Sequence, residues 1–166
     1  RASGISFRIG RWNIKGNPIA ILIDFKPYFN EKDKVFTSWW ESYKLDSISG
    51  GWDYIEPALF GYAVGRLIHN FQKYYGVYQD GIIAHFHEWM AGTAIPDIRK
   101  EQIPIRIVFT THATLLGRYL AMNDPEFYNH LAFTDWEKEA KHFNIEANVK
   151  LERACAHGAN IFTTVS

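Results

Sequence analysis

Long apolar runs and an excess of charge of one sign are missing from this sequence of 166 residues, and cysteine occurs only once. No uninterrupted apolar stretch approaches the ~20 residues that a membrane-spanning helix requires, and no signal peptide opens the chain. We therefore expect no membrane partner. The single cysteine, Cys155, excludes an internal disulfide. That favours a reducing compartment, and we expect the protein to be cytoplasmic.

The charges are balanced, with 18 basic and 18 acidic residues. A balanced chain has no basic excess to attract a polyanion, so we expect no nucleic-acid partner. What the chain does have is a hydrophobic fraction of 47% and an aromatic fraction of 16%. The first is enough for a substantial core and argues against disorder, and the second suits a protein that handles sugars.

Residues 1–166 provide enough chain for one domain, and the first residue is Arg1 rather than methionine. We therefore interpret the chain as a single-domain fragment of a longer protein. Apolar runs at residues 81–86, 105–111 and 160–166 alternate with helical patterns. Such alternation predicts an α/β fold of Rossmann-like type, with a largely parallel sheet and flanking helices.

An antiparallel hairpin is predicted ahead of this sheet, with residues 16–17 in its turn. Residues 19–25 are nearly all apolar, so the second strand of the hairpin is expected to be covered on both faces. Residues 26–51 show no sustained period and are predicted to form a long loop. Its Trp39 and Trp40 are better explained as anchors of the loop on the core than as platforms for a sugar ring.

The clearest helix is predicted from apolar residues that recur at three- and four-residue spacing after Asp53. Asp53 is the predicted N-cap, and Gly76 the predicted end. Gly61 and Gly65 lie one turn apart, and we expect them to let a neighbouring element approach closely.

A last helix is predicted from Asp135 to His157, with Gly158 as its C-cap. Cys155 falls beside the apolar stripe of this helix. We therefore interpret it as a small core residue rather than a reactive thiol.

The stretch GIIAHFHEWMAG places two histidines at the carboxyl end of a predicted parallel strand. Open α/β sheets bind ligands in the crevice at this edge. In an extended strand His85 and His87 point to one side, with Phe86 on the other. The next strand brings Thr111 and His112 to the same edge, and the segment THATLLGR then begins a helix whose free N–H groups are available to an anion or to sugar hydroxyls. The sequence therefore predicts a ligand site here.

A metal site is the competing interpretation, because His85, His87, Glu88 and His112 carry donors of the type that zinc binds. Against it, the pattern His-x-His-x-Asp-His of binuclear hydrolases is not completed, since residues 90–91 are Met-Ala. Glu88 is also typical of the first turn of a helix, where the helix dipole favours an acidic residue. We therefore predict no metal and no cofactor.

Four longer segments carry a resemblance to a known family. They are GRWNIKGNPIAILIDF, AHFHEWMAG, FTTHATLLGRYL and LERACAHGANIFTTVS. Together they resemble the N-terminal domain of the glycogen synthases of the fungal and animal type, glycosyltransferase family 3. The similarity runs from about Phe7 to Ser166 with the motifs in the same order. Met90 stands where the family often has leucine, which is a mild apolar exchange.

The resemblance implies part of the N-terminal half of a GT-B enzyme, in which two Rossmann-like domains face a cleft. Such enzymes transfer glucose from a nucleotide sugar, normally UDP-glucose in this branch, to the 4-hydroxyl at a glycogen chain end. They retain the configuration at the anomeric carbon and need no metal. The implied partners are that donor and a glycogen or oligosaccharide acceptor.

His87 matches the histidine of the related motif His-Asp-Trp-x-Ala-Gly and is the expected catalytic residue. By this resemblance its imidazole or carbonyl holds the transferred glucose while positive charge develops at the anomeric carbon. Glu88 and Trp89 are expected to be structural supports rather than chemical groups.

Five further residues are the predicted substrate-binding set. His112, Thr111 and Thr114 match the next motif of the family and are expected to line the cleft. Arg118 is expected to reach a phosphate, the acceptor or an acidic structural partner. His85 joins them because it shares a strand face with the catalytic histidine.

The family's glycine-rich loop would precede Arg1, and its nucleotide-binding domain with the Glu-x7-Glu motif would follow Ser166. We therefore expect an active glycosyltransferase in the longer parent protein and no catalysis by the fragment alone. Two rivals stay open, a carbohydrate-binding or scaffold module without catalysis and a metal-dependent hydrolase. UDP or ADP as the donor nucleotide, a homo-oligomeric state of the full-length protein, and its regulation also stay open.

Overall fold

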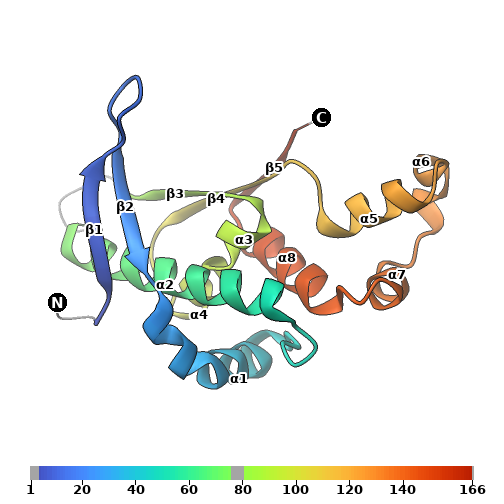
Figure 1. The fold of residues 1–166 in the computed structure, drawn as a ribbon, viewed down its shortest axis with the longest axis horizontal. Coiled ribbons are helices and arrows are strands. Elements are labelled where there is room, and N and C mark those ends of the chain that lie inside the picture. Colours follow the sequence, from blue (N-terminus) through green and yellow to red (C-terminus); the bar gives the residue numbers. More distant parts are fainter. Residues whose placement is uncertain (1–3, 76–80, 166) are drawn as a thin grey trace.

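The computed structural model describes residues 4–75 and 81–165, which form a mixed α/β structure with two sheets (Figure 1). The strands are β1 (Ser6–Arg11), β2 (Ile19–Asp24), β3 (Ile83–His87), β4 (Arg106–Thr111) and β5 (Ile161–Thr164). The helices are η1 (Lys26–Glu31), α1 (Lys32–Tyr43), α2 (Trp52–Tyr75), α3 (Glu88–Gly92), α4 (Ile95–Lys100), α5 (Leu115–Asn123), α6 (Phe127–His130), η3 (Leu131–Phe133), α7 (Trp136–His142) and α8 (Glu146–Gly158). β1 and β2 pair antiparallel, and β3, β4 and β5 form a parallel sheet in that order. The predicted parallel pairing of the three later apolar runs is confirmed.

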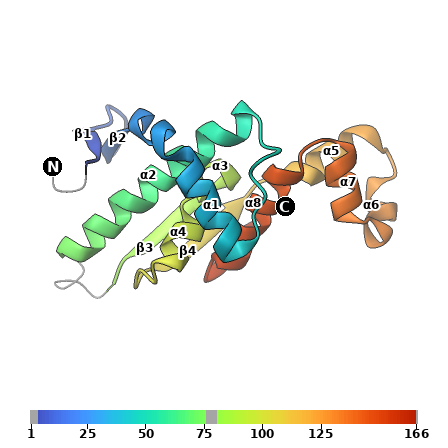
Figure 2. The same cartoon turned by 90° about the horizontal axis from the view of Figure 1, so that it is seen from below.

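Helices cover one face of the parallel sheet within the described residues. α2, α3, α4 and α8 lie below the strands in Figure 1, and Figure 2 shows the same layer from beneath. Phe86, Ile107 and Phe109 point into this layer and are buried. On the opposite face Ile83 and Ile161 are exposed. The predicted flanking helices are therefore found on one side of the sheet in this part of the chain.

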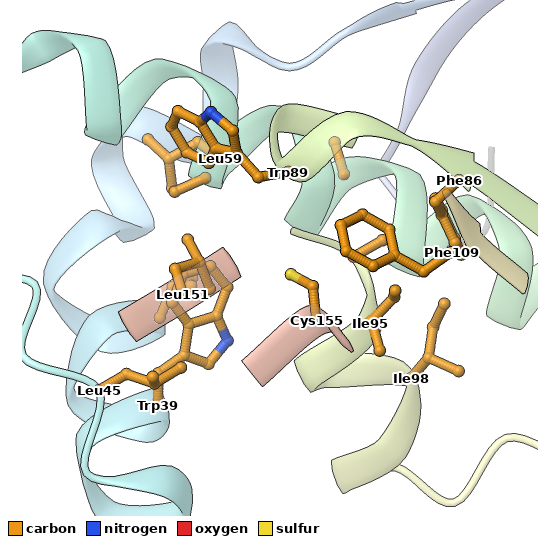
Figure 3. Packing of buried hydrophobic residues seen from close by; sticks show 14 of the residues in the cluster. Trp39, Leu45, Leu59, Phe86, Trp89, Ile95, Ile98, Phe109, Leu151 and Cys155 are labelled. Carbon is orange, nitrogen blue, oxygen red and sulfur yellow. The ribbon is translucent and has the colours of Figure 1, made fainter. Parts of the chain in front are cut away.

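The core lies between the sheet and this helical layer and extends among the helices to α1 (Figure 3). Its largest fully buried side chains include Trp39 from α1, Leu59 from α2, Phe109 from β4 and Leu151 from α8. Cys155 is among them, and its thiol donates a hydrogen bond to a backbone carbonyl, so its interpretation as a core residue is confirmed. A second, smaller apolar cluster joins α5, α7 and α8.

α2 is the predicted long helix, but it begins earlier than predicted. Asp53 lies in its first turn rather than at the N-cap, because the N–H groups of the next two residues already bond to the carbonyl of Gly51. Gly76, the predicted end, lies outside the described residues. A Cβ on Gly61 would lie 1.7 Å from the Oγ1 of Thr93, which confirms the expected close approach. None of the described helices combines the length and the apolarity needed to cross a bilayer.

Residues 26–51, predicted to be a loop, are largely helical in η1 and α1. α1 buries only a narrow stripe that includes Val35 and Trp39, so its period is too weak to recognise in the sequence. The indole N–H of Trp39 donates to Asp97 Oδ2 at 3.0 Å, which confirms that this residue anchors the segment. Trp40 is 51% exposed and lines an open groove of about 580 Å³ beside α1, so it is not an anchor.

The hairpin forms where predicted, and its turn residues Gly16 and Asn17 both have positive φ, at 92° and 43°. The expectation that residues 19–25 are covered on both faces is wrong. Ile19 and Leu22 are mostly exposed, because the hairpin is a separate two-stranded sheet and only part of one side packs on the core.

The predicted helix from Asp135 to His157 is two helices, α7 and α8. The chain breaks at Asn144, which adopts the left-handed conformation with φ 56° and so cannot continue a helix. Asp135 is the N-cap of α7, where its carboxylate accepts two backbone N–H groups. Gly158 is the last residue of α8 rather than its cap.

Candidate functional site

The two histidines of β3 lie side by side on the uncovered face of the parallel sheet. Their ring centroids are 4.1 Å apart, while Phe86 between them is buried, so the predicted direction of these side chains is confirmed. His85 Nε2 lies 2.8 Å from Thr110 Oγ1 on β4, which lies 2.6 Å from Thr163 Oγ1 on β5. A hydrogen-bonded row therefore crosses the sheet and fixes His85 beside His87.

The turn from β3 into α3 passes through a strained residue. Glu88 has φ 65°, in the left-handed region, which costs a non-glycine residue roughly 1–2 kcal/mol. Behind it Trp89 is buried, and a Cβ on Gly92 would lie 2.8 Å from Phe109 Cε2. α3 is therefore held tightly against β4, and this packing fixes the direction in which Glu88 leaves the strand.

Glu88 spans the carboxyl ends of β3 and β4. Its Oε1 lies 2.9 Å from the backbone N and 2.7 Å from Nδ1 of His112, and its Oε2 accepts a long hydrogen bond of 3.4 Å from Thr111 Oγ1. Burial alone would raise the pKa of Glu88, but the hydrogen bonds from His112 and the nearby Arg118 outweigh it and hold the pKa below its usual value. The carboxylate is therefore ionised at neutral pH and acts only as an acceptor.

The imidazoles at this edge form one open cluster. The rings of His87 and His112 are 6.4 Å apart between centroids and inclined by only 27°. The side chain of His112 is 52% exposed, and His85 and His87 are exposed too. Within residues 4–75 and 81–165, no three His, Cys, Asp or Glu side chains converge as a metal ion would require. The described edge thus presents hydrogen-bonding groups for a polar ligand.

The start of α5 is less open to a ligand than predicted. Thr114 is the N-cap, and its hydroxyl accepts the N–H of Gly117 at 3.1 Å. The N–H of Leu115 donates to Glu152 Oε2 on α8 at 3.0 Å. Two of the N–H groups expected to be free are therefore occupied. Arg118 is exposed, and its positive charge helps to keep the pKa of Glu88 low and partly opposes the burial that raises the pKa of Glu152.

Glu152 is the site residue that sequence reasoning missed. Its side chain is buried, and within the described residues its Oε1 has no hydrogen-bond partner. Burial raises its pKa to about 6, opposed by the Leu115 hydrogen bond and reinforced by the charge of Glu88. No pattern marks this residue in the sequence, since a glutamate within a charged helix is normally solvent-facing. Its role becomes visible only when α8 is packed against α5.

Comparison with known proteins places these residues in a family. The sequence model described as glycogen synthase matches residues 1–166. Glycogen [starch] synthase of Neurospora crassa is 39% identical over 166 residues, which are 100% of this chain and 23% of that protein. Isoform 2 of Saccharomyces cerevisiae is 40% identical over 164 residues, and the liver form of Mus musculus is 38% identical over 165 residues. Each of these alignments covers 98% of this chain and 23% of the relative.

The chain thus spans less than a quarter of the length of the curated relatives it matches, and it matches them along essentially its whole extent. The four segments that carry the resemblance supply β2, β3, β4 and β5, and two of them, at the ends of β3 and β4, supply the histidine cluster. The resemblance predicted from the sequence is confirmed: the chain belongs to the glycogen synthase family.

Proposed function

We propose that this chain forms part of the N-terminal half of a GT-B glycogen synthase, whose two Rossmann-like halves face a cleft. The proposed reaction transfers glucose from UDP-glucose to the 4-hydroxyl at a glycogen chain end, with retention of configuration. The observation that supports it most is that His87, Glu88 and His112 lie close together at the carboxyl edge of a parallel sheet. This edge is where open α/β sheets hold their ligands.

His87 is the proposed catalytic residue. Its backbone is extended, with φ −110° and ψ 124°, and its neighbours Phe86 and Trp89 are both buried. The core therefore fixes the backbone of His87, and with it the direction of the His87 carbonyl and the point from which the imidazole leaves the strand. As glucose leaves the diphosphate, positive charge develops at the anomeric carbon. A dipole already aligned with that charge stabilises the transition state without having to reorganise.

We divide the other five predicted site residues into two groups by proposed role. His85, His112 and Arg118 are exposed, and we assign them the direct contacts with substrate, with Arg118 facing the phosphates. Thr111 is buried, and its hydroxyl donates to Glu88. Thr114 caps α5. We propose that these two threonines support the substrate-binding groups from behind.

The remainder of the proposed enzyme lies in a longer protein, since the chain spans 23% of its relatives' length. We propose that the nucleotide-binding half is supplied by that protein, that the enzyme is cytoplasmic, and that residues 1–166 alone do not turn over the donor. Half a cleft leaves the nucleotide without its binding groups and the reaction without preorganisation.

Glucose transfer to glycogen by the full-length protein tests the proposal. UDP-glucose and ADP-glucose are supplied separately in the presence of EDTA, with the 166-residue chain assayed beside the full-length protein. We expect the full-length protein to form α-linked product from UDP-glucose even in the presence of EDTA. We expect the isolated chain to form no product. Absence of transfer from either donor, or transfer that requires an added metal ion, would contradict the proposal.

A further inference from the structure

The contact between Glu88 and His112 carries an inference that goes beyond the proposed reaction, although it rests on that proposed function. We propose that Glu88 is a positioning residue that keeps a hydrogen on Nδ1 of His112, so that Nε2 faces the cleft as an acceptor for a hydroxyl group of the bound sugar.

The hydrogen bond between Nδ1 of His112 and Glu88 has a defined direction. Three donors converge on the Glu88 carboxylate: the backbone N–H of His112, its Nδ1, and the hydroxyl of Thr111. An ionised carboxylate has no hydrogen to donate, so Nδ1 must supply it. A neutral imidazole carries only one hydrogen, and Nε2 of His112 is then left with a lone pair.

The lone pair on Nε2 lies on the side of the His112 ring away from Glu88. Glu88 holds the Nδ1 side of the ring against the protein, and half of the His112 side chain remains exposed. Nε2 makes no hydrogen bond to any residue in the described part of the chain. The His87 ring lies nearly parallel to it at a centroid distance of 6.4 Å, a spacing that a single hexose can bridge. A sugar held by His87 therefore brings its hydroxyl groups to Nε2 of His112.

Glu88 itself has a strained backbone conformation. A left-handed glutamate is unfavourable, and such residues persist where the surrounding structure needs them, commonly at functional sites. Glycine would remove the strain but also the carboxylate. Glutamine would keep the shape but offer a single carbonyl oxygen to three donors. The strained conformation is therefore coupled to the contact that orients His112.

A double-mutant cycle in the full-length protein tests this role. Glu88→Ala, His112→Ala and the double variant are compared for kcat and KM with UDP-glucose and glycogen, with the melting temperature of each variant measured in parallel. Carboxylates that orient metal-binding histidines typically contribute about 10–100-fold to affinity or activity. By analogy we expect a loss of kcat/KM of about that size in each single variant. Because Glu88 acts through His112, the double variant should match His112→Ala within about 2-fold.

Asp124→Ala is the matched control. It removes a carboxylate from another histidine, His130, whose Nδ1 lies 2.6 Å from Asp124 Oδ2 at the far end of α5. This pair is remote from the β3 and β4 ends, so kcat/KM should stay at the wild-type value. A loss like that of Glu88→Ala would show that breaking any such pair disturbs the enzyme, and would overturn the proposal.

The possible results distinguish a failure of the proposed role of Glu88 from a failure of the proposed glucose transfer. A wild-type protein that transfers no glucose overturns both. Normal transfer with additive losses in the cycle, or with wild-type kinetics in Glu88→Ala, overturns only the role of Glu88. If Glu88→Ala lowers the melting temperature, the isosteric Glu88→Gln takes its place in the cycle, and additive losses there overturn the proposal equally.

Discussion

Replacing Gly61 by alanine should destabilise the protein, whereas the same replacement at Gly65, one turn further along α2, should stabilise it. A Cβ on Gly61 would lie 1.7 Å from Thr93 Oγ1 and 2.7 Å from the backbone N of Ala94. Thr93 is fully buried, and its hydroxyl bonds to two backbone carbonyls at 2.8 and 3.1 Å. Rotating the Thr93 side chain away would break both hydrogen bonds and leave the clash with the Ala94 backbone, so α2 itself must shift.

The magnitudes follow from two opposing effects. Alanine is better than glycine in a helix interior by about 1 kcal/mol. Around Gly65 the nearest atom to a Cβ is 3.5 Å away, which is an ordinary contact, so we expect a gain of about 0.5–1 kcal/mol. At Gly61 overpacking costs about 1–3 kcal/mol, and the backbone clash places the cost at the upper end. We expect a net loss of about 1–2 kcal/mol there.

Urea unfolding followed by tryptophan fluorescence measures both variants, since the buried Trp39 and Trp89 report on the core beside α2. The unfolding midpoints should move in opposite directions from the wild-type value. A Gly61→Ala midpoint at or above that of Gly65→Ala would refute the close packing of α2 against the segment that joins α3 to α4.

Three further predictions concern buried titratable groups. The pKa of Glu152 is raised from 4.5 to about 6, so its stabilising contribution is complete below pH 4.5 and is lost as the pH rises through 6. The free energy of unfolding of Glu152→Gln, measured relative to that of the wild type, should therefore increase by about 2 kcal/mol as the pH rises from about 4.5 to about 7. A difference that does not change with pH would contradict this. The pKa of Asp97 is raised from 3.8 to about 7, chiefly by burial and against the Trp39 hydrogen bond. Asp97→Asn keeps an acceptor for Trp39. Its free energy of unfolding relative to the wild type, measured by urea unfolding at each pH, should increase by up to roughly 4 kcal/mol as the pH rises from about 4 to about 8. Burial raises the pKa of the Cys155 thiol, so a disulfide reagent should label it only after unfolding, and rapid stoichiometric labelling of the native protein would show that it is accessible.

The parts of the fold that the sequence predicted are those with strong local signals. Apolar runs identified β3, β4 and β5, and the turn residues Gly16 and Asn17 identified the hairpin. The failures arise where tertiary contacts decide. α1 forms although its apolar stripe is narrow, and Asn144 breaks a helix through a backbone conformation that residue identity favours only weakly.

The residues of the site likewise include some that local sequence signals could place and some that depend on tertiary contacts. Placement of His85, His87 and His112 follows from strand alternation and from the meeting of parallel strand ends at one edge. The two carboxylates that hold this edge were harder to foresee. Glu88 was expected as a support, but its contact with His112 depends on a left-handed backbone. Glu152 lies far along the chain, and its contact with α5 depends on how α8 packs.

The most direct test of the proposed role of His87 is the kcat/KM of His87→Ala in the full-length protein, with UDP-glucose and glycogen as substrates and circular dichroism as the check on folding. We predict a folded protein whose kcat/KM falls at least ~100-fold, equivalent to about 2.7 kcal/mol of lost transition-state stabilisation. A folded His87→Ala protein that transfers glucose at close to the wild-type rate would contradict the assignment of this strand edge as the catalytic site.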